Sequence, residues 1–285
     1  MSSKETFASW EAFLEVLREI EAAKEHIRFE DGEECFYRGH PKREYELLPT
    51  LFRTKRRYRA HRDLEADLFF EFKARAHALH GSGLTDWDVL FFMRHHGVPT
   101  RLLDWTESLG IALYFALHDQ DGRPLNESPC IHLLNPYSLN LKSEWEERDL
   151  IAPKYIWYGT DDEGVWDYGD ILVEDIGMDW DSPIAIYPEQ RSQRVRAQHG
   201  WFTLHGDDVR PIDQQVRGVT SKVEIPARAI PGARHFLKLA GLDHFAVYPD
   251  LDGLARTLID KHTPAPKPAG KGRRPRRPAR TRGGR

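Results

Sequence analysis

The sequence lacks most of the features that mark the commonest protein classes. It has two cysteines in 285 residues, Cys35 and Cys130, and they are too far apart to form a metal-binding or redox motif. No apolar run approaches the roughly 18 residues that a membrane span needs, and the N-terminus has no apolar signal region. We therefore expect a cytoplasmic protein with two reduced thiols and no membrane contact.

The commonest catalytic motifs are absent too. There is no Gly-rich phosphate loop of the P-loop or Rossmann type, and no Gly-x-Ser-x-Gly elbow. The 14 histidines are scattered without the spacing of metal ligands, so the sequence predicts no metal site. These absences argue against the usual NTPase, dehydrogenase and hydrolase designs.

Charge is divided unevenly along the chain. The whole chain carries 41 Lys and Arg against 45 Asp and Glu. Residues 261–285 hold three Lys, seven Arg and no acid, which leaves 31 basic and 45 acidic residues in 1–260. This terminal stretch is rich in Pro, Gly, Lys and Arg and cannot bury apolar surface, so we expect a disordered basic tail.

Helical patterns and short apolar runs alternate through the rest of the chain. The spacing predicts helices over Phe7–Lys24 and Leu251–Lys261, and strands over Cys35–Gly39 and Phe245–Tyr248. This mixture predicts an α+β fold, a single mixed domain of short strands with packed helices. The expected divisions are an N-terminal helix in 1–28, the main domain in 29–260 and the tail in 261–285.

One stretch, His95–Thr106, concentrates charge between two apolar helical patterns. It contains Arg101 and Asp104 around a Gly-x-Pro turn. Buried charges are costly unless they are paired and hydrogen-bonded. We therefore expect either a structural polar network, in which Arg101 and Asp104 pair with each other or with partners across the site, or the floor of a binding site.

Three groups of segments together resemble the FRG domain, a bacterial family named for a Phe-Arg-Gly-type signature. The first is Phe36–His40 with Leu48–Arg53, the second is Arg94–Thr106 with Ala112–Ala116, and the third is Arg196–Thr203 with Tyr248–Leu254. They span about Phe29 to Leu258. The chain departs from the family pattern at Arg94, where Gln is common, and at His96, where Tyr is frequent.

The resemblance extends to one motif of ADP-ribosyltransferases, because the strand around Arg38 is similar to their first motif. It implies that Arg38 grips the diphosphate or ribose of NAD, as an arginine can through two parallel hydrogen bonds. A late strand of those enzymes supplies a glutamate. Gln198 is the nearest counterpart here, and Glu189 and Glu224 stay open as alternatives.

The catalytic candidates are thus Arg38, His95 and Gln198. Two of them have a structural alternative: an ion pair with Asp104 for Arg38, and a helix cap for His95. Hydrogen bonds in turns explain Thr100 and Thr106 as well as ligand contacts do. Packing in the core explains Trp105 as well as stacking on a flat ligand ring does. The candidate ligand-binding residues are Tyr37, Gly39, Thr100, Arg101, Asp104, Trp105 and Thr106.

The functional hypothesis is a nucleotide-binding protein with ADP-ribosyltransferase-type activity, NAD as its cofactor and no metal. The resemblance also implies a role in bacterial defence. The alternative is a non-catalytic module that binds a nucleotide or nucleic acid with help from the basic residues of 263–285. A third interpretation makes Arg38, Arg101 and Asp104 a structural network.

Overall fold

The computed structural model describes residues 3–53, 60–80, 83–118, 128–143, 167–169, 172, 181–187 and 193–263. The strands are β1 (Phe36–His40), β2 (Leu102–Thr106), β3 (Cys130–Leu134), β4 (Ile184–Ile186), β5 (Gly200–Leu204) and β6 (Thr220–Glu224). They form an antiparallel sheet in the order β4-β5-β2-β1-β3-β6. The predicted α+β class is confirmed. The tail beyond Thr263 and Glu189 lie outside the described residues.

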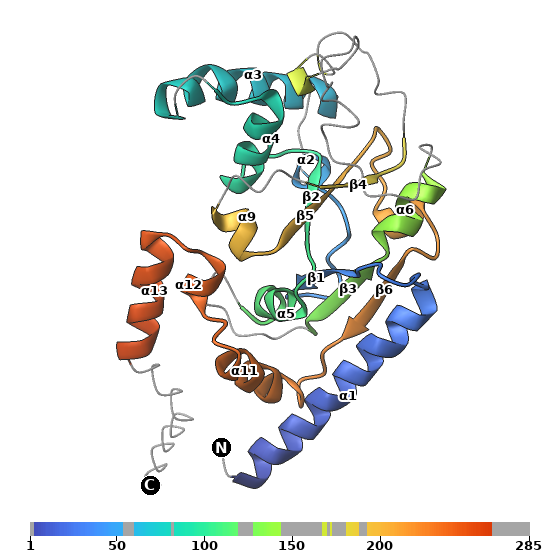
Figure 1. The fold of residues 1–285 in the computed structure, drawn as a ribbon, viewed down its shortest axis with the longest axis vertical. Coiled ribbons are helices and arrows are strands. Elements are labelled where there is room, and N and C mark those ends of the chain that lie inside the picture. Colours follow the sequence, from blue (N-terminus) through green and yellow to red (C-terminus); the bar gives the residue numbers. More distant parts are fainter. Residues whose placement is uncertain are drawn as a thin grey trace, which may run out of the picture.

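Helices connect and cover these strands (Figure 1). They are α1 (Ser3–Ile27), α2 (Thr50–Arg53), α3 (His61–His80), α4 (Asp86–His95), α5 (Leu109–Leu117), α6 (Pro136–Lys142), α9 (Gln193–Ala197), α10 (Ile212–Gln215), α11 (Ile230–Leu239), α12 (His244–Val247) and α13 (Leu251–His262). No helix of the described segments combines the length and hydropathy that a bilayer crossing requires.

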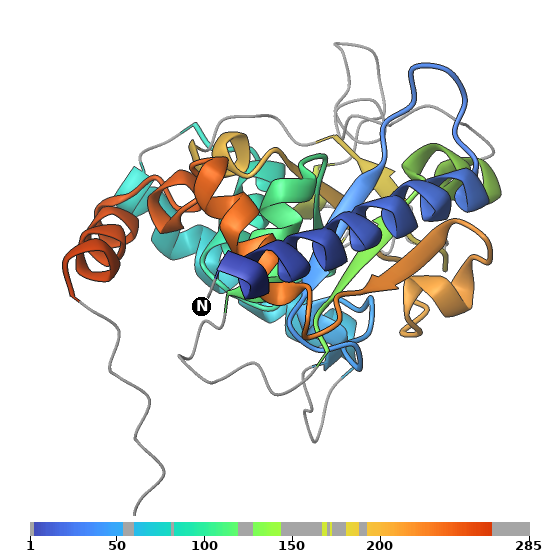
Figure 2. The same cartoon turned by 90° about the horizontal axis from the view of Figure 1, so that it is seen from below.

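The predicted strand over Phe245–Tyr248 is wrong. Residues 244–247 form the short helix α12, because the Asp243 side chain accepts a hydrogen bond from the Ala246 amide and caps it. Helix α13 follows as predicted, capped in the same way by Asp250. Figure 2 shows α13 at one end of the molecule and α6 at the other.

Two groups of helices cover different halves of the sheet. Helices α1, α5 and α11 share a core cluster with β1, β3 and β6, where Phe13, Ala112 and Ile131 are buried. Helices α3 and α4 share another with β2, β4 and β5, where Phe69, Leu90 and Phe202 are buried. In Figure 1, α4 and α5 lie on either side of the central strand β2.

Close packing of α5 on β1 depends on a glycine of the aromatic strand. A Cβ added at Gly39 would lie 1.8 Å from the Ala112 carbonyl oxygen and 2.7 Å from the Ala116 backbone nitrogen. The neighbouring Arg38 faces the other way, since successive side chains of a strand alternate. Gly39 thus lets the helix sit against the strand that carries Arg38.

We expect Gly39→Ala to lower the free energy of unfolding by about 3 kcal/mol, because helix backbone must move to relieve the overlap. Gly200→Ala is the matched control: it is also a strand glycine, but its added Cβ would meet nothing closer than 3.4 Å. Urea unfolding of both variants measures the effect. Equal stability of the two variants would contradict this packing.

Candidate functional site

The sheet opens between β1 and β2, and polar side chains fill the opening. One register pair, Tyr37 opposite Thr106, joins these strands, whereas five pairs join β1 to β3. Arg38 bridges the opening: its Nη1 donates to the Asp104 backbone carbonyl at 2.6 Å. A side chain thus satisfies a strand carbonyl where the neighbouring strand has moved away.

Asp104 is the anion at the centre of this group. Arg94 holds it through Nε, at 3.0 and 2.8 Å from the two carboxylate oxygens, and through Nη2. Arg38 Nη1 lies 3.4 Å from Oδ2. Burial alone would raise the pKa of Asp104, but the charge and hydrogen bonds of Arg94 and the charge of Arg38 outweigh it and lower the pKa to about 2.

A third guanidinium stands beside the other two. The Thr50 hydroxyl oxygen accepts from Arg94 Nη1 at 2.8 Å and from Arg53 Nη2 at 3.2 Å. Burial, together with the nearby charges of Arg94 and Arg53, lowers the pKa of Arg38 to about 10, although Asp104 opposes the shift. Arg38 and Arg94 therefore contact the Asp104 carboxylate, whose side chain is 40% exposed, and Arg53 lies near enough for the charge of Asp104 to act on it. The group has an excess of positive charge and access to solvent.

Local sequence explains how Arg94 reaches this position. Thr85 and Asp88 form a capping box that starts α4, and the helix ends where Gly97 takes a φ of +78°. This places Arg94 in the last helical turn, next to the start of the β2 segment. The sequence pattern does not single out Arg94. Its one signal is an arginine in the polar stretch at a position where FRG sequences commonly have Gln.

His95 follows Arg94 in the chain and carries a neutral imidazole. Burial and the charge of Arg194 lower the pKa of His95 to about 4, so the ring is uncharged near pH 7. Arg194 Nη1 donates to the His95 carbonyl at 3.3 Å, and its guanidinium lies 4.5 Å from the centroid of the Tyr248 ring. A charged helix cap is therefore not the role of His95, and α9 and α12 are fixed against the end of α4.

Gln198 is held between β2 and α12. Its backbone carbonyl accepts from the Thr106 hydroxyl at 2.7 Å, and its side-chain Nε2 donates to the Val247 carbonyl at 3.1 Å. Val247 precedes Tyr248, whose pKa rises mainly through burial and in part through the Asp104 charge. The three catalytic candidates thus belong to one connected region, although no direct bond joins them.

Other candidates have structural positions. Arg101 is fully buried and forms an ion pair with Glu65, with Nε 2.7 Å from Oε2. Thr100 is also fully buried, and the Trp105 indole donates to the Thr203 hydroxyl at 3.2 Å. Tyr37 and Gly39 face the α5 side of β1. Of the predicted ligand-binding residues, Asp104 has the most accessible polar side chain.

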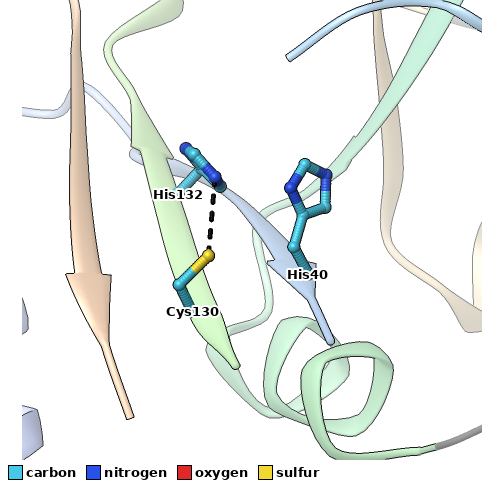
Figure 3. Close-up of side chains that lie close together, drawn as sticks. All are labelled: His40, Cys130 and His132. Carbon is cyan, nitrogen blue, oxygen red and sulfur yellow. Dashed lines mark hydrogen bonds between the residues drawn. The ribbon is translucent and has the colours of Figure 1, made fainter. Parts of the chain in front are cut away.

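A second cluster lies on β1 and β3 (Figure 3). His40, Cys130 and His132 are buried, and one ligand atom from each lies within 4.8 Å of the others. Burial lowers the pKa of His40 to about 2 and that of His132 to about 3. The sequence pattern does not reveal this cluster, because it depends on how the two strands pair. The Cys-x-His alternation of β3 is its local signal.

The comparisons with known proteins bear on the first half of the chain. The model of the FRG domain family matches residues 33–123. This part of the chain is therefore similar to the FRG domain. The match includes Arg38, Arg94 and Asp104, whereas β5 and α12 follow it in the sequence. No curated protein and no solved structure matches this chain, so the similarity of the FRG domain to ADP-ribosyltransferases stays a prediction.

We expect Asp104→Asn to lower the free energy of unfolding by about 1–2 kcal/mol at pH 7, after allowance for the solvent exposure of the pair. The folded-state pKa of Asp104 lies below its unfolded value. Its stabilisation is therefore fully present above about pH 4 and is lost as the pH falls through about 2. Urea unfolding of both proteins across this range checks the effect. A stability difference independent of pH would contradict it.

Proposed function

We propose that this protein binds a nucleotide through its diphosphate at the group formed by Arg38, Arg53, Arg94 and Asp104, with NAD as the preferred ligand. The observation that carries the proposal is the excess of guanidinium over carboxylate at one partly exposed place. One aspartate cannot neutralise three arginines, and a diphosphate supplies the missing negative charge. Guanidinium groups also match phosphate oxygens in geometry through parallel hydrogen bonds.

The arginines differ in how firmly they are already held. Arg94 contacts both oxygens of Asp104 and also Thr50, whereas Arg38 contacts the Asp104 carbonyl and, at 3.4 Å, one carboxylate oxygen. Arg53 is exposed at the end of α2. We assign the diphosphate to Arg38 and Arg53, with Asp104 and Arg94 as the fixed pair that orients them.

Neighbouring groups suit the remainder of a dinucleotide. His95 is neutral, so it can donate or accept a hydrogen bond at a ribose hydroxyl without adding charge. Tyr248 presents an aromatic ring beside the Arg194 guanidinium. His244 already stacks on the Tyr248 ring, so the planar Arg194 guanidinium is the group that can stack on a flat base.

The chemistry we propose for the bound NAD is ADP-ribosyl transfer. The bond between the ribose and nicotinamide breaks, nicotinamide leaves, and an acceptor or water attacks the ribose carbon. A carboxylate assists this step by stabilising the positive charge on the ribose. Glu107 directly follows Thr106, whose hydroxyl donates to the Gln198 carbonyl. It is an ionised carboxylate: burial alone would raise its pKa, but hydrogen bonds involving His199, Glu34 and Trp201 lower it.

We expect Arg38→Ala to weaken the binding of NAD and ADP-ribose at least about tenfold, because a charge-assisted hydrogen bond to phosphate contributes about 1.5–3 kcal/mol. Arg228→Ala is the matched control, since Arg228 is an exposed arginine paired with Glu15 on α1. Isothermal titration calorimetry measures the affinities, and thermal unfolding confirms that each variant is folded.

Failure of the wild-type protein to bind NAD or ADP-ribose, or equal affinities for the two arginine variants, would overturn the proposal. A short RNA in the same titration tests the alternative function. Salt-sensitive RNA binding that falls when residues 263–285 are deleted, together with no NAD binding, would favour the nucleic-acid module.

We expect Glu107→Gln to reduce the release of nicotinamide from NAD by about 100-fold while leaving NAD affinity within about twofold. Gln198→Ala is expected to act in the same direction but less strongly, because a neutral amide stabilises the positive charge on the ribose less than a carboxylate does. Chromatographic detection of nicotinamide measures the reaction. Binding of NAD without nicotinamide release by the wild-type protein would limit the function to binding.

A further inference from the structure

The geometry of the second cluster points to a metal site independent of the nucleotide proposal. We propose that His40, Cys130 and His132 bind one Zn²⁺ ion through His40 Nε2, Cys130 Sγ and His132 Nε2. Thiolate sulfur and imidazole nitrogen are the donors that zinc prefers in proteins.

Strand pairing places the three side chains on one face of the sheet. His40 lies directly opposite Cys130, and His132 lies directly opposite Arg38. Cys130 and His132 are two residues apart on β3, so their side chains point to the same face. In this arrangement, the three donor side chains come from two paired strands, so their backbone positions are set before any ion binds.

One of the observed distances already matches a zinc site. Cys130 Sγ lies 3.6 Å from His132 Nε2. Bonds of about 2.3 Å to sulfur and about 2.1 Å to nitrogen, at a tetrahedral angle, separate two such ligand atoms by about 3.6 Å. One nitrogen of each histidine and Cys130 Sγ lie within 4.8 Å of one another, so side-chain adjustment is needed to bring all three donors to the separations of a zinc site.

The tautomer of His40 also suits a metal ligand. Its Nδ1 lies 3.2 Å from the Tyr45 backbone carbonyl, which only accepts hydrogen bonds, so Nδ1 carries the proton. The lone pair is therefore on Nε2, where it accepts from Arg38 Nε at 2.9 Å. Metal-binding histidines usually donate their second ring N–H to such a carbonyl, which fixes the ring.

Arg38 competes with a metal for His40. An ion on Nε2 takes the lone pair that Arg38 Nε now uses, so this hydrogen bond must break when the metal binds. Arg38 keeps its bond to the Asp104 carbonyl through Nη1. Three protein ligands leave a fourth position on zinc for water or another donor, as in catalytic rather than structural zinc sites.

Metal titration of the full chain tests the site. The purified protein is stripped with a chelator and titrated with Zn²⁺ against a chromophoric competitor, and with Co²⁺ as a spectroscopic probe. We expect one ion per chain, a cobalt–thiolate charge-transfer absorption, and a rise in melting temperature with Zn²⁺. Absence of stoichiometric binding or of the thiolate absorption in the wild-type protein would overturn the proposal.

Variants identify the ligands. Cys130→Ser is expected to abolish the charge-transfer absorption and to weaken Zn²⁺ binding well over tenfold. Cys35→Ser is the matched control, because Cys35 is the other buried thiol and packs in the core under α1. Loss of the absorption in Cys35→Ser, or its persistence in Cys130→Ser, would assign the metal elsewhere.

Two further variants keep the test decisive if Cys130→Ser fails to fold. His132→Cys should retain the ion and strengthen the thiolate absorption, which a purely structural role of His132 does not predict. Arg38→Ala should keep or tighten Zn²⁺ binding, because it removes a competing donor and a nearby charge, while NAD binding falls. Loss of both ligands in a folded Arg38→Ala protein would contradict the metal site and leave the nucleotide proposal standing.

Discussion

The polar centre of this protein depends on one carboxylate that serves more cations than it can neutralise. Asp104 holds Arg94 tightly and Arg38 loosely, and Arg53 joins them through Thr50. Guanidinium groups lose hydration when they are brought together near a core, and an anion must compensate. The negative charge of Asp104 is enough to hold Arg94, and with it the end of α4, against β2. The remaining positive charge is the basis of the diphosphate proposal.

The fold places this charge where the sheet is least regular. Between β1 and β2 the ladder has a single register pair, and Arg38 replaces a missing backbone donor at the Asp104 carbonyl. The two helix groups cover the sheet on either side of this opening. On one side Gly39 lets α5 contact β1 closely, and on the other the Arg101–Glu65 ion pair ties β2 to α3. Packing on both flanks confines these polar groups to the opening between β1 and β2.

Local patterns in the sequence predict much of this architecture, because caps and periodicity act within a few residues. Threonine is a residue type that favours a helix start, and Thr85 begins α4 through a capping box with Asp88. The helix α12 was mistaken for a strand, since four apolar and aromatic residues fit either structure until the Asp243 cap is considered. The partners of Asp104 and the meeting of His40 with Cys130 depend on tertiary pairing, which residue spacing alone does not contain.

Arg38 connects the two sites, because it is the residue that each of them shares. Its Nε donates to His40 and its Nη1 to Asp104, so the guanidinium is divided between an imidazole acceptor and an anionic centre. A cation bound at His40 would remove the first acceptor, and the Arg38 side chain would then need another. A diphosphate offers that acceptor, and the metal charge nearby favours the same anion. If the two ligands bind in this way, each raises the affinity for the other by the same factor, since coupling free energy is reciprocal. This coupling requires that neither site alone satisfies all the hydrogen-bond donors of Arg38.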